Sequence, residues 1–306
     1  MEGSAKDYAM LHFVVLIWGF TAILGVLISV PAVEIVFYRT LMASTAIGLI
    51  FLIKKTKIGL PPDQVIKIVA TGFIIAIHWI LFFWAARAAT VSVALAGFAT
   101  CTLWTAFLEP IANKTKLKWY EILLGLVVIS GLYVIFRFEF GYWVGLTMAI
   151  TSAFLGALFT VINAKLIKRH SPFILTFYEM VGACMFTVLF FPVYSRFLTT
   201  EGQGLQLKLE GYDWLWLLIL AGVCTVYAFS VSVELMKRLT AFAVNLTVNL
   251  EPVYGIILAV LIFGEQEKMT AGFYIGTLII LLAVCIYPII SYFYRRKKAK
   301  QLLRMQ

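Results

Sequence analysis

The chain has 306 residues, of which 62% are hydrophobic and only 13% are charged, and its mean hydropathy is +0.97. A soluble domain of this length cannot bury so much apolar surface, so the composition excludes a water-soluble protein and predicts an all-α membrane protein. The formal charge of +10 does not indicate a nucleic-acid partner, because nearly all basic residues fall between apolar runs or in the C-terminal tail.

Ten apolar runs follow one another along the chain, and each is close to the roughly 20 residues that a spanning helix needs. We expect transmembrane helices, numbered as spans 1 to 10, at residues 8–28, 34–53, 65–86, 90–111, 117–136, 143–165, 171–194, 212–235, 240–263 and 269–292. Charged and turn-forming residues separate them, for example Lys54-Lys55-Thr56-Lys57 followed by Pro61-Pro62. No small-residue cleavage site follows the first run, so we interpret it as a retained span.

The distribution of basic residues predicts how the chain is oriented. With both termini in the cytoplasm, 19 of the 25 lysines and arginines lie on the cytoplasmic side, 5 lie outside, and Arg39 lies within a span. Short cytoplasmic loops are enriched in basic residues. The sequence therefore predicts a multi-pass protein of the cell inner (plasma) membrane with both termini cytoplasmic.

Two short patterns occur twice in the chain. Phe37-Tyr38-Arg39 returns as Phe177-Tyr178-Glu179 at an offset of 140, and the pattern at 86–90 returns at 237–241 at an offset of 151. Five spans per half is an odd number, so the halves would enter the membrane in opposite directions. We expect two inverted five-helix repeats, at 1–140 and 141–292, and a basic cytoplasmic tail at 293–306. Such repeats are typical of secondary transporters.

Short motifs recur at fixed places within the spans. In chain order they are Trp18-Gly19-Phe20, Phe37-Tyr38-Arg39, Leu250-Glu251-Pro252-Val253, Gly264-Glu265, and the glycines Gly272 and Gly276. Their order and spacing resemble the EamA-type branch of the drug/metabolite transporter superfamily over almost the whole chain. The resemblance implies a solute carrier with a central cavity lined by spans 1–4 and 6–9, and with spans 5 and 10 at the periphery. Cys101 stands where the second half has Pro252, so the kink expected in span 9 is not expected in span 4.

Glu251 is the most informative ionisable residue within a predicted span. It lies near the middle of span 9, where a charged group costs about 2.5–3.5 kcal/mol on insertion scales, and Pro252 follows it and removes a backbone donor. One interpretation is a solute or proton site in the cavity wall. The other is a carboxyl group that only ties neighbouring helices together.

Arg39 and Glu179 are equivalent in the repeat, and both are candidates for substrate binding. Inverted topology would place Arg39 in the outer half of the membrane and Glu179 in the inner half, so each could act at one gate. Alternatively, the long side chain of Arg39 extends outward to Glu34, five residues earlier. We favour this structural interpretation for Arg39 and cavity lining for Glu179.

His78 and Trp79 lie in the middle of span 3. A buried histidine is most often neutral and hydrogen-bonded to a neighbouring helix, but it is also a candidate for solute contact or proton relay. Asn245 and Asn249 share one face of span 9, and Asn163 lies alone in span 6. Such amides either join helices or line a polar wall.

Four aromatic residues near the middle of spans complete the candidates for substrate binding. They are Trp18, Trp104, Tyr178 and Tyr227. Taken singly, each is more typical of helix packing than of a binding site.

Motifs for other chemistries are missing from the sequence. It has no P-loop, no His-Glu-x-x-His pair and no nucleophile elbow, so we expect no catalytic residue, no metal site and no cofactor.

We predict a secondary transporter, not an enzyme, that exports small organic metabolites by alternating access through a central cavity. Its substrates would be amino acids or related compounds, or drugs. The alternatives are a membrane-embedded enzyme and a channel-like facilitator. The expected partners are a small-molecule solute and the lipid bilayer, not nucleic acid, and a homodimer is left open.

Overall fold

The computed structural model describes residues 4–117, 119–138, 140–199 and 204–303, and every regular element within these ranges is helical. Eight of the described segments are long and apolar enough to cross a membrane: Ala5–Leu27, Ala32–Ile53, Pro62–Ala88, Val91–Asn113, Trp143–Leu166, Pro172–Phe197, Asp213–Leu235 and Ala241–Glu267. The helices at the remaining two predicted spans, α7 (Trp119–Phe138) and α14 (Ala271–Leu303), contain shorter apolar stretches at Leu123–Ile135 and Ala271–Ala283. The prediction of a multi-pass, all-α membrane protein is confirmed, and the count of ten spans stays a prediction.

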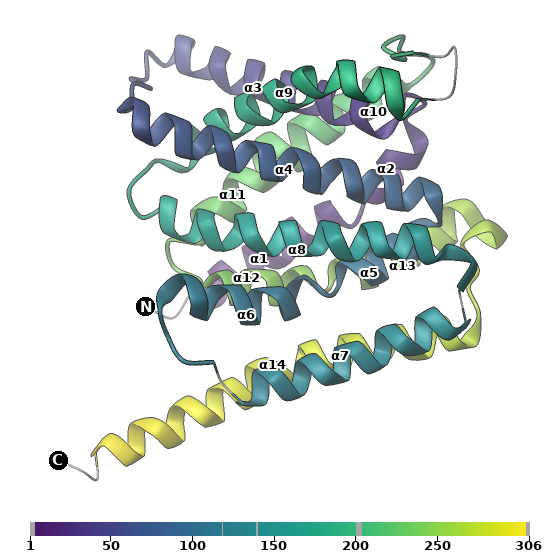
Figure 1. Cartoon of the computed structure of the whole chain (residues 1–306). Coiled ribbons are helices and arrows are strands. Elements are labelled where there is room, and N and C mark those ends of the chain that lie inside the picture. Colours follow the sequence, from purple (N-terminus) through teal and green to yellow (C-terminus); the bar gives the residue numbers. More distant parts are fainter. Residues whose placement is uncertain (1–3, 118, 139, 200–203, 304–306) are drawn as a thin grey trace.

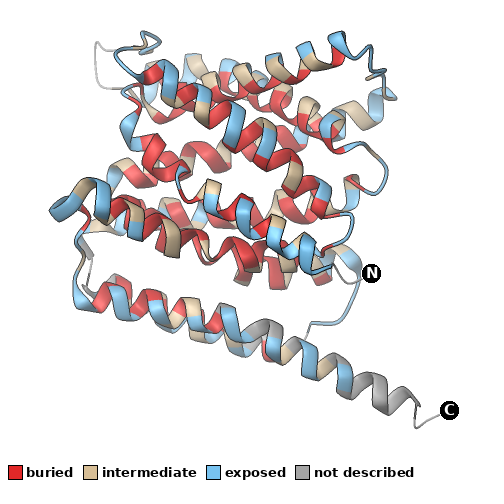
Figure 2. Cartoon of the chain, turned by 180° about the vertical axis from the view of Figure 1, so that it is seen from behind, coloured by how far each residue is buried: buried red, intermediate tan, exposed pale blue. Residues whose placement is uncertain are grey.

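The outward surface of the bundle is rich in large apolar side chains. Figure 2 shows buried residues on the inner faces of the helices and exposed residues on the outer faces. The exposed residues include Leu52 and Leu261, each 74% exposed, and Phe197 at 71%. A soluble monomer rarely exposes such patches, whereas hydrocarbon chains cover them without penalty.

Helices α7 and α14 lie side by side at the edge of the bundle (Figure 1). Gly131 of α7 and Gly276 of α14 bring the two backbones together, because a Cβ atom on either glycine would come within 2.8 Å of the other residue's carbonyl oxygen. Small residues allow this close approach between membrane helices. The peripheral position implied for spans 5 and 10 agrees with the observed packing.

Three of the long spans are interrupted near their middle. The pairs of half-helices are α1 (Ala5–Trp18) with α2 (Thr21–Leu27), α5 (Val91–Phe98) with α6 (Cys101–Asn113), and α12 (Ala241–Val248) with α13 (Glu251–Phe263). The expectation that span 4 lacks an interruption is wrong, because the chain breaks there without a proline. The hydroxyl of Thr100 donates to the carbonyl of Gly97 at this break, at 2.8 Å. Pro252 stands in the first turn of α13, where its missing N–H leaves no helical hydrogen bond unmade.

The broken helices of the two halves match in length. α5 and α12 have 8 residues each, and α6 and α13 have 13 each. Thr90 and Thr240 cap the first helix of each pair through their side-chain oxygens, and they are 150 residues apart. The sequence patterns gave an offset of 151, which is one residue too many here. Cys101, not Thr100, is therefore the counterpart of Glu251.

The remaining helices frame these broken ones. They are α3 (Ala32–Ile53), α4 (Pro62–Ala88), α8 (Trp143–Leu166), α9 (Pro172–Phe197), α10 (Asp213–Leu218), the π-helix η2 (Ile219–Tyr227) and α11 (Ala228–Leu235), with short 3₁₀ turns η1 (Phe140–Tyr142) and η3 (Gly264–Glu267). α4 packs against α8 and α9, and α3 packs against α9 and η2. A π-helix is uncommon and often marks a functional position.

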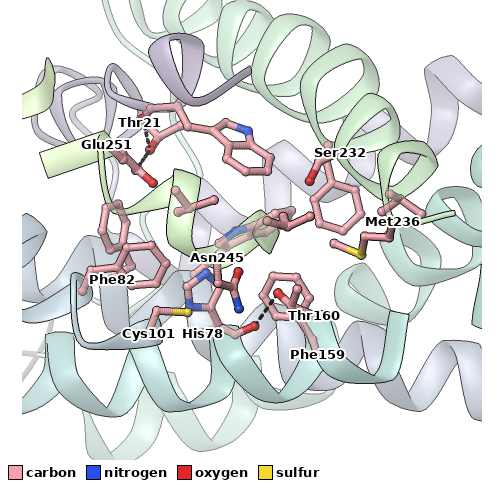
Figure 3. A pocket seen from close by; sticks show the side chains of 18 of the residues that line it. Thr21, His78, Phe82, Cys101, Phe159, Thr160, Ser232, Met236, Asn245 and Glu251 are labelled. Carbon is pink, nitrogen blue, oxygen red and sulfur yellow. Dashed lines mark hydrogen bonds between the residues drawn. The ribbon is translucent and has the colours of Figure 1, made fainter. Parts of the chain in front are cut away.

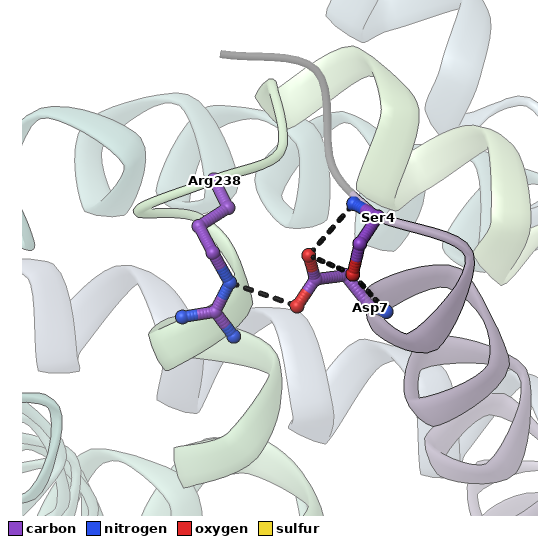
Figure 4. Close-up of polar contacts among 3 residues, drawn as sticks. All are labelled: Ser4, Asp7 and Arg238. Carbon is purple, nitrogen blue, oxygen red and sulfur yellow. Dashed lines mark hydrogen bonds and ion pairs between the residues drawn. The ribbon is translucent and has the colours of Figure 1, made fainter.

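Two arginines from the repeated pattern lie at opposite ends of the first span. Arg87 donates from Nε to the carbonyl of Gly25 at 2.9 Å, near the end of α2. Arg238 pairs with Asp7 at 2.8 Å, in the first turn of α1 (Figure 4). Ser4 and Asp7 form a reciprocal capping box, which holds the Asp7 carboxylate in place for this ion pair.

The first and last helices have their free ends on the same side of the molecule. α1 begins and α14 ends at the same end of the bundle in Figure 1. This arrangement agrees with an even number of crossings. Lys118 and Arg304, two of the basic residues counted for the orientation, lie outside the described residues.

The N-termini of α5 and α12 are each capped by a carboxylate from a distant segment. Glu267 accepts hydrogen bonds from the backbone N–H of Val91 at 2.8 Å, from that of Ser92 at 2.9 Å, and from the Ser92 hydroxyl at 2.7 Å. Glu109 accepts one from the N–H of Phe242 at 3.0 Å. These contacts hold the N-terminal ends of α5 and α12 in place and join the two halves of the chain.

Glu267→Gln is expected to lower the free energy of unfolding by about 1–3 kcal/mol. The amide offers one acceptor oxygen in place of two and removes a negative charge from a helix N-terminus. Thermal unfolding of the purified protein in detergent measures this loss. Glu265→Gln is the matched control, because the Glu265 side chain is 82% exposed and pairs with Lys268 at the surface. Equal melting temperatures for the two variants would contradict the expected cap.

Candidate functional site

A cavity lies where the broken helices meet α3, α4, α8 and α11 (Figure 3). Its empty space, including the part that opens to solvent, is about 680 Å³. A mostly apolar lining with a few polar side chains is typical of small-molecule sites. The lining comes from predicted spans 1–4, 6, 8 and 9. Span 7, which was also expected to line the cavity, contributes no lining residue.

Aromatic rings make most of the apolar wall. They are Trp18, Trp79, Phe82, Phe98, Phe159 and Phe229. The rings contact one another across helices, with centroid distances of 5.4 Å between Phe82 and Phe98 and 6.0 Å between Trp79 and Phe229. Trp18 is fixed by its indole N–H, which donates to the carbonyl of Cys224 at 3.0 Å. Such a wall suits an apolar or aromatic part of a solute.

Arg39 supplies the positive charge of the cavity. Its Nε donates to the hydroxyl of Thr225 in η2 at 2.7 Å, and its guanidinium carbon lies 3.6 Å from the ring centroid of Trp79. The residue is only 3% exposed. The favoured sequence interpretation, an outward-pointing Arg39 paired with Glu34, is therefore wrong. Glu34 instead accepts a hydrogen bond from the backbone N–H of Gln206 at 3.1 Å.

Glu251 supplies the acidic group of the cavity. It is the first residue of α13, so the positive end of a helix dipole lies beside it at a buried position. Thr21 donates to the carbonyl of Trp18 at 2.7 Å, and its hydroxyl lies 3.4 Å from Oε1 of Glu251. Glu251 and Arg39 both line the cavity without forming an ion pair with each other. Both side chains are therefore available to a bound molecule.

His78 is hydrogen-bonded to a neighbouring helix and also lines the cavity, so its role in solute contact or proton relay stays a prediction. Its Nδ1 lies 2.9 Å from the carbonyl and 2.8 Å from the hydroxyl of Ser152 on α8, so the ring is hydrogen-bonded to a neighbouring helix. The same ring lines the cavity between Phe98 and Phe159, at centroid distances of 5.4 Å from each. His78 and Trp79 thus both reach the cavity, as expected from their place in span 3.

The two asparagines of span 9 join helices. Asn245 donates to the hydroxyl of Thr105 at 2.7 Å and also lines the cavity. Asn249 donates to the hydroxyl of Thr102 and lies outside the lining. Both bonds attach α12 to α6. Asn245 and Glu251 lie on either side of the helix break and line the same cavity.

Three of the predicted aromatic residues lie away from the cavity. Trp104 packs edge-on against Phe154 at 5.4 Å. Tyr178 donates to the carbonyl of Ile58 at 3.0 Å, in the connection between α3 and α4. Tyr227 is 42% exposed on the outer side of the bundle. Trp104 and Tyr227 lie near the middle of their spans but point away from the centre, whereas Tyr178 lies near the start of α9.

Glu179 and Asn163 also lie outside the cavity lining. Both are fully buried, and Asn163 faces the Glu179 carboxyl between α8 and α9. The expectation that Glu179 lines the cavity is therefore not met, because α9 directs this side chain toward α8. Of the twelve candidates, the cavity brings together Trp18, Arg39, His78, Trp79, Asn245 and Glu251.

Several lining residues were not among the candidates. Thr21, Cys101, Thr160, Ser232 and Met236 are the polar or sulfur-containing ones. Gly156, Phe159 and Thr160 follow the i, i+3, i+4 spacing of one helix face, as do Phe229, Ser232 and Val233 on α11. This spacing identifies a shared face, but many faces of an apolar helix have it. Only the packing shows which face borders the cavity.

Comparisons with known proteins agree with this arrangement. The model of the EamA-like transporter family matches residues 7–137 and again residues 143–287. No curated protein sequence matches the chain. A solved structure titled only "Crystal structure of protein" is similar, with a TM-score of 0.66, 14% sequence identity, and coverage of 95% of this chain and 99% of that chain. At this identity it shows a shared fold alone.

The family match covers most of the chain and confirms the resemblance seen in the sequence motifs. The protein belongs to the EamA-like transporter family, whose members are membrane transporters of small molecules.

Proposed function

We propose that this protein is a secondary transporter that exports small zwitterionic metabolites, such as amino acids, by alternating access through the central cavity. The observation that carries the proposal is the pair of opposite charges, Arg39 and Glu251, in one aromatic-lined cavity. A guanidinium binds a carboxylate through two parallel hydrogen bonds, and a carboxylate binds an ammonium group. The aromatic wall would accept the apolar part of the solute.

The proposed inverted repeat is supported by three observations. The family model matches the two halves separately, at 7–137 and 143–287. The broken helices of the halves have equal lengths. Arg87 and Arg238, which the repeat pairs, contact opposite ends of the first span. Two inverted halves around one site can exchange conformations, so that the cavity opens to either side in turn.

We place the transporter in the inner membrane with both termini in the cytoplasm. The 19-to-5 distribution of basic residues supports this orientation. Family substrates include exported drugs and metabolites, which supports the outward direction. The proposed division into units at 1–140, 141–292 and 293–306 follows the same repeat.

Solute flux into liposomes tests the proposed function. Purified protein would be reconstituted and supplied with a panel of radiolabelled amino acids and related zwitterions. We expect flux that saturates with solute concentration for at least one member. Flux without saturation would indicate a channel-like facilitator. No flux for any member would contradict the proposal.

A membrane-embedded enzyme is the second candidate, because the cavity gathers four titratable side chains, Arg39, His78, Cys101 and Glu251. These side chains come from four different helices and all line one space. The same liposome assay separates the candidates when the recovered solute is identified by mass spectrometry. A transporter returns the solute unchanged, whereas an enzyme returns a product.

Glu251→Gln is expected to weaken the binding of zwitterionic solutes by about 10- to 100-fold, the usual value of a hydrogen bond to a charged group. The binding of the corresponding carboxylic acid without its amino group should stay within about 3-fold, since Arg39 is intact. Competition against the labelled solute measures both affinities. Glu234→Gln, an exposed position on α11, is the matched control. Equal losses for the two ligand types would contradict the assignment of the ammonium site to Glu251.

A further inference from the structure

A second buried acid lies beside the cavity, in a pair of side chains that the proposed solute site does not use. Glu179 of α9 and Asn163 of α8 are both 0% exposed. The two carboxyl oxygens and the two amide atoms have no hydrogen-bond partner of normal geometry among the described residues. Among the described residues, Asn163 is the one polar side chain that lies next to the Glu179 carboxyl group. Buried polar groups are rarely left in this condition without a function.

No charge compensates the Glu179 carboxyl. α9 packs against α3, α4 and α11, and α8 packs against α4, α5, α6 and α12. The buried or half-buried titratable side chains on these helices include Glu34 and Arg39 on α3, His78 and Arg87 on α4, Cys101 and Glu109 on α6, and Cys184 and Tyr194 on α9 itself. Arg39 is hydrogen-bonded to Thr225 and His78 to Ser152, and neither bonds to Glu179.

The nearest neighbours of Glu179 are uncharged. Gly72 of α4 packs against its backbone, and one turn earlier Ser230 of α11 donates to the hydroxyl of Thr176 at 3.3 Å. An ionised carboxylate in such a place carries a large desolvation cost. A protonated carboxyl does not.

The chemistry of the two side chains matches a protonated Glu179. A carboxylic acid and a carboxamide can form two reciprocal hydrogen bonds, in which the acid O–H donates to the amide oxygen and the amide N–H donates to the carbonyl oxygen of the acid. An ionised Glu179 only accepts hydrogen bonds, so Oδ1 of Asn163 would be left without a donor. The amide oxygen of Asn163 therefore gains a donor from Glu179 when the acid carries its proton.

The pair lies between the cavity and one end of the bundle. Asn163 follows the lining residue Thr160 by three residues, about 4.5 Å along α8, in the direction of the helix end. Glu179 is seven residues after the start of α9. α8 ends and α9 begins at the end of the bundle where α1 begins (Figure 1). Opening of this end would bring water to the carboxyl first.

We propose that Glu179 and Asn163 form a proton-binding site that couples solute export to proton entry. The coupling rests on the proposed function, whereas the proton site itself does not. Glu179 takes one proton from water when the cavity opens at the far end, and it releases that proton to water when the near end opens and hydrates the carboxylate. The only bond that forms and breaks is the O–H bond of this carboxyl group.

Infrared spectroscopy of the full-length protein in lipid nanodiscs tests the site without any solute. At neutral pH the wild-type spectrum should contain the carbonyl-stretching band of a protonated carboxylic acid, and Glu179→Gln should remove that component. Glu234→Gln, at an exposed position, should leave it unchanged. Asn163→Leu keeps the acid and should shift its band, because the amide partner is lost. A wild-type spectrum from which Glu179→Gln removes no component would overturn the proposal.

A pH gradient across proteoliposomes tests the coupling. In the wild type, we expect the gradient to drive accumulation of the labelled solute above equilibrium. Glu179→Gln should still exchange solute at equal concentrations but lose gradient-driven accumulation. Accumulation driven by a sodium gradient and not by a pH gradient would overturn the coupling. Absence of flux in the wild type would overturn the proposed function and the coupling, while the infrared spectrum would still decide whether Glu179 binds a proton.

Discussion

Replacing Arg39 by methionine is expected to reduce solute affinity by roughly 100-fold, because it removes the positive charge from the cavity. The Thr225 hydrogen bond and the Trp79 ring hold the guanidinium in one orientation. No hydrogen bond from its terminal nitrogens to a described residue is present, so these nitrogens can meet a carboxylate. Binding of the labelled solute to purified protein measures the loss.

Arg39→Lys is expected to lose about 10-fold, because an ammonium group keeps the charge but not the planar fork or the contact with Trp79. Arg196→Met, at an exposed position near the end of α9, should bind solute as the wild type does. Size-exclusion profiles and melting temperatures show whether each variant is folded. Folded Arg39→Met protein with wild-type affinity would contradict the role of Arg39 in solute binding.

Gly72→Ala is expected to lower the free energy of unfolding by about 1–3 kcal/mol, the usual cost of overpacking. A Cβ atom on Gly72 of α4 would lie 2.8 Å from the backbone nitrogen of Ala183 and 3.0 Å from Cα of Gly182 on α9. Both atoms belong to a helix backbone and cannot move aside as a side chain would. Gly182→Ala should have a similar effect, since its Cβ would meet the backbone of Val69 at 2.9 Å.

Thermal unfolding in detergent measures both glycine variants. Gly222→Ala is the matched control, because a Cβ atom there would have no neighbour within 4 Å. The same close contact positions the backbone of Glu179, so Gly72→Ala should also shift the infrared band assigned to its carboxyl group. A melting temperature equal to that of Gly222→Ala would show that α4 and α9 do not pack at this distance.

The helix positions could be predicted because they depend on local composition. Each long apolar segment of the structure begins and ends within a few residues of a predicted span, as for Pro172–Phe197 against 171–194. In hydrocarbon every backbone polar group must be paired within the segment, so a long apolar run has helix as its one stable form. Breaks were harder to predict. In span 9, Pro252 indicates the break in the sequence. In span 4 the helix breaks at Thr100, where the sequence has no proline.

Half of the candidate site residues line the cavity, because the sequence does not show how each helix is rotated about its own axis. Depth in the membrane follows from counting residues along a helix, and it placed Arg39, His78 and Glu251, which line the cavity, among the candidates. The direction in which a side chain points depends on how the helix is rotated against its neighbours. Tyr227 and Trp104 have suitable depths but point away from the cavity. An apolar helix in lipid has no polar face to reveal its rotation, because lipid and protein interior are equally apolar.

The sequence by itself determined the class of this protein: a helical membrane protein with a twofold repeat and the motifs of the EamA-like family. These properties rest on hydropathy, charge and order of residues along the chain, none of which needs a folded structure. Only the tertiary structure decided that Arg39 faces Trp79 in the cavity rather than Glu34, and that Glu179 meets Asn163 outside it. Arg39 and Trp79 are 40 residues apart, and Glu179 and Asn163 are 16 residues apart on different helices, so only helix packing brings each pair together.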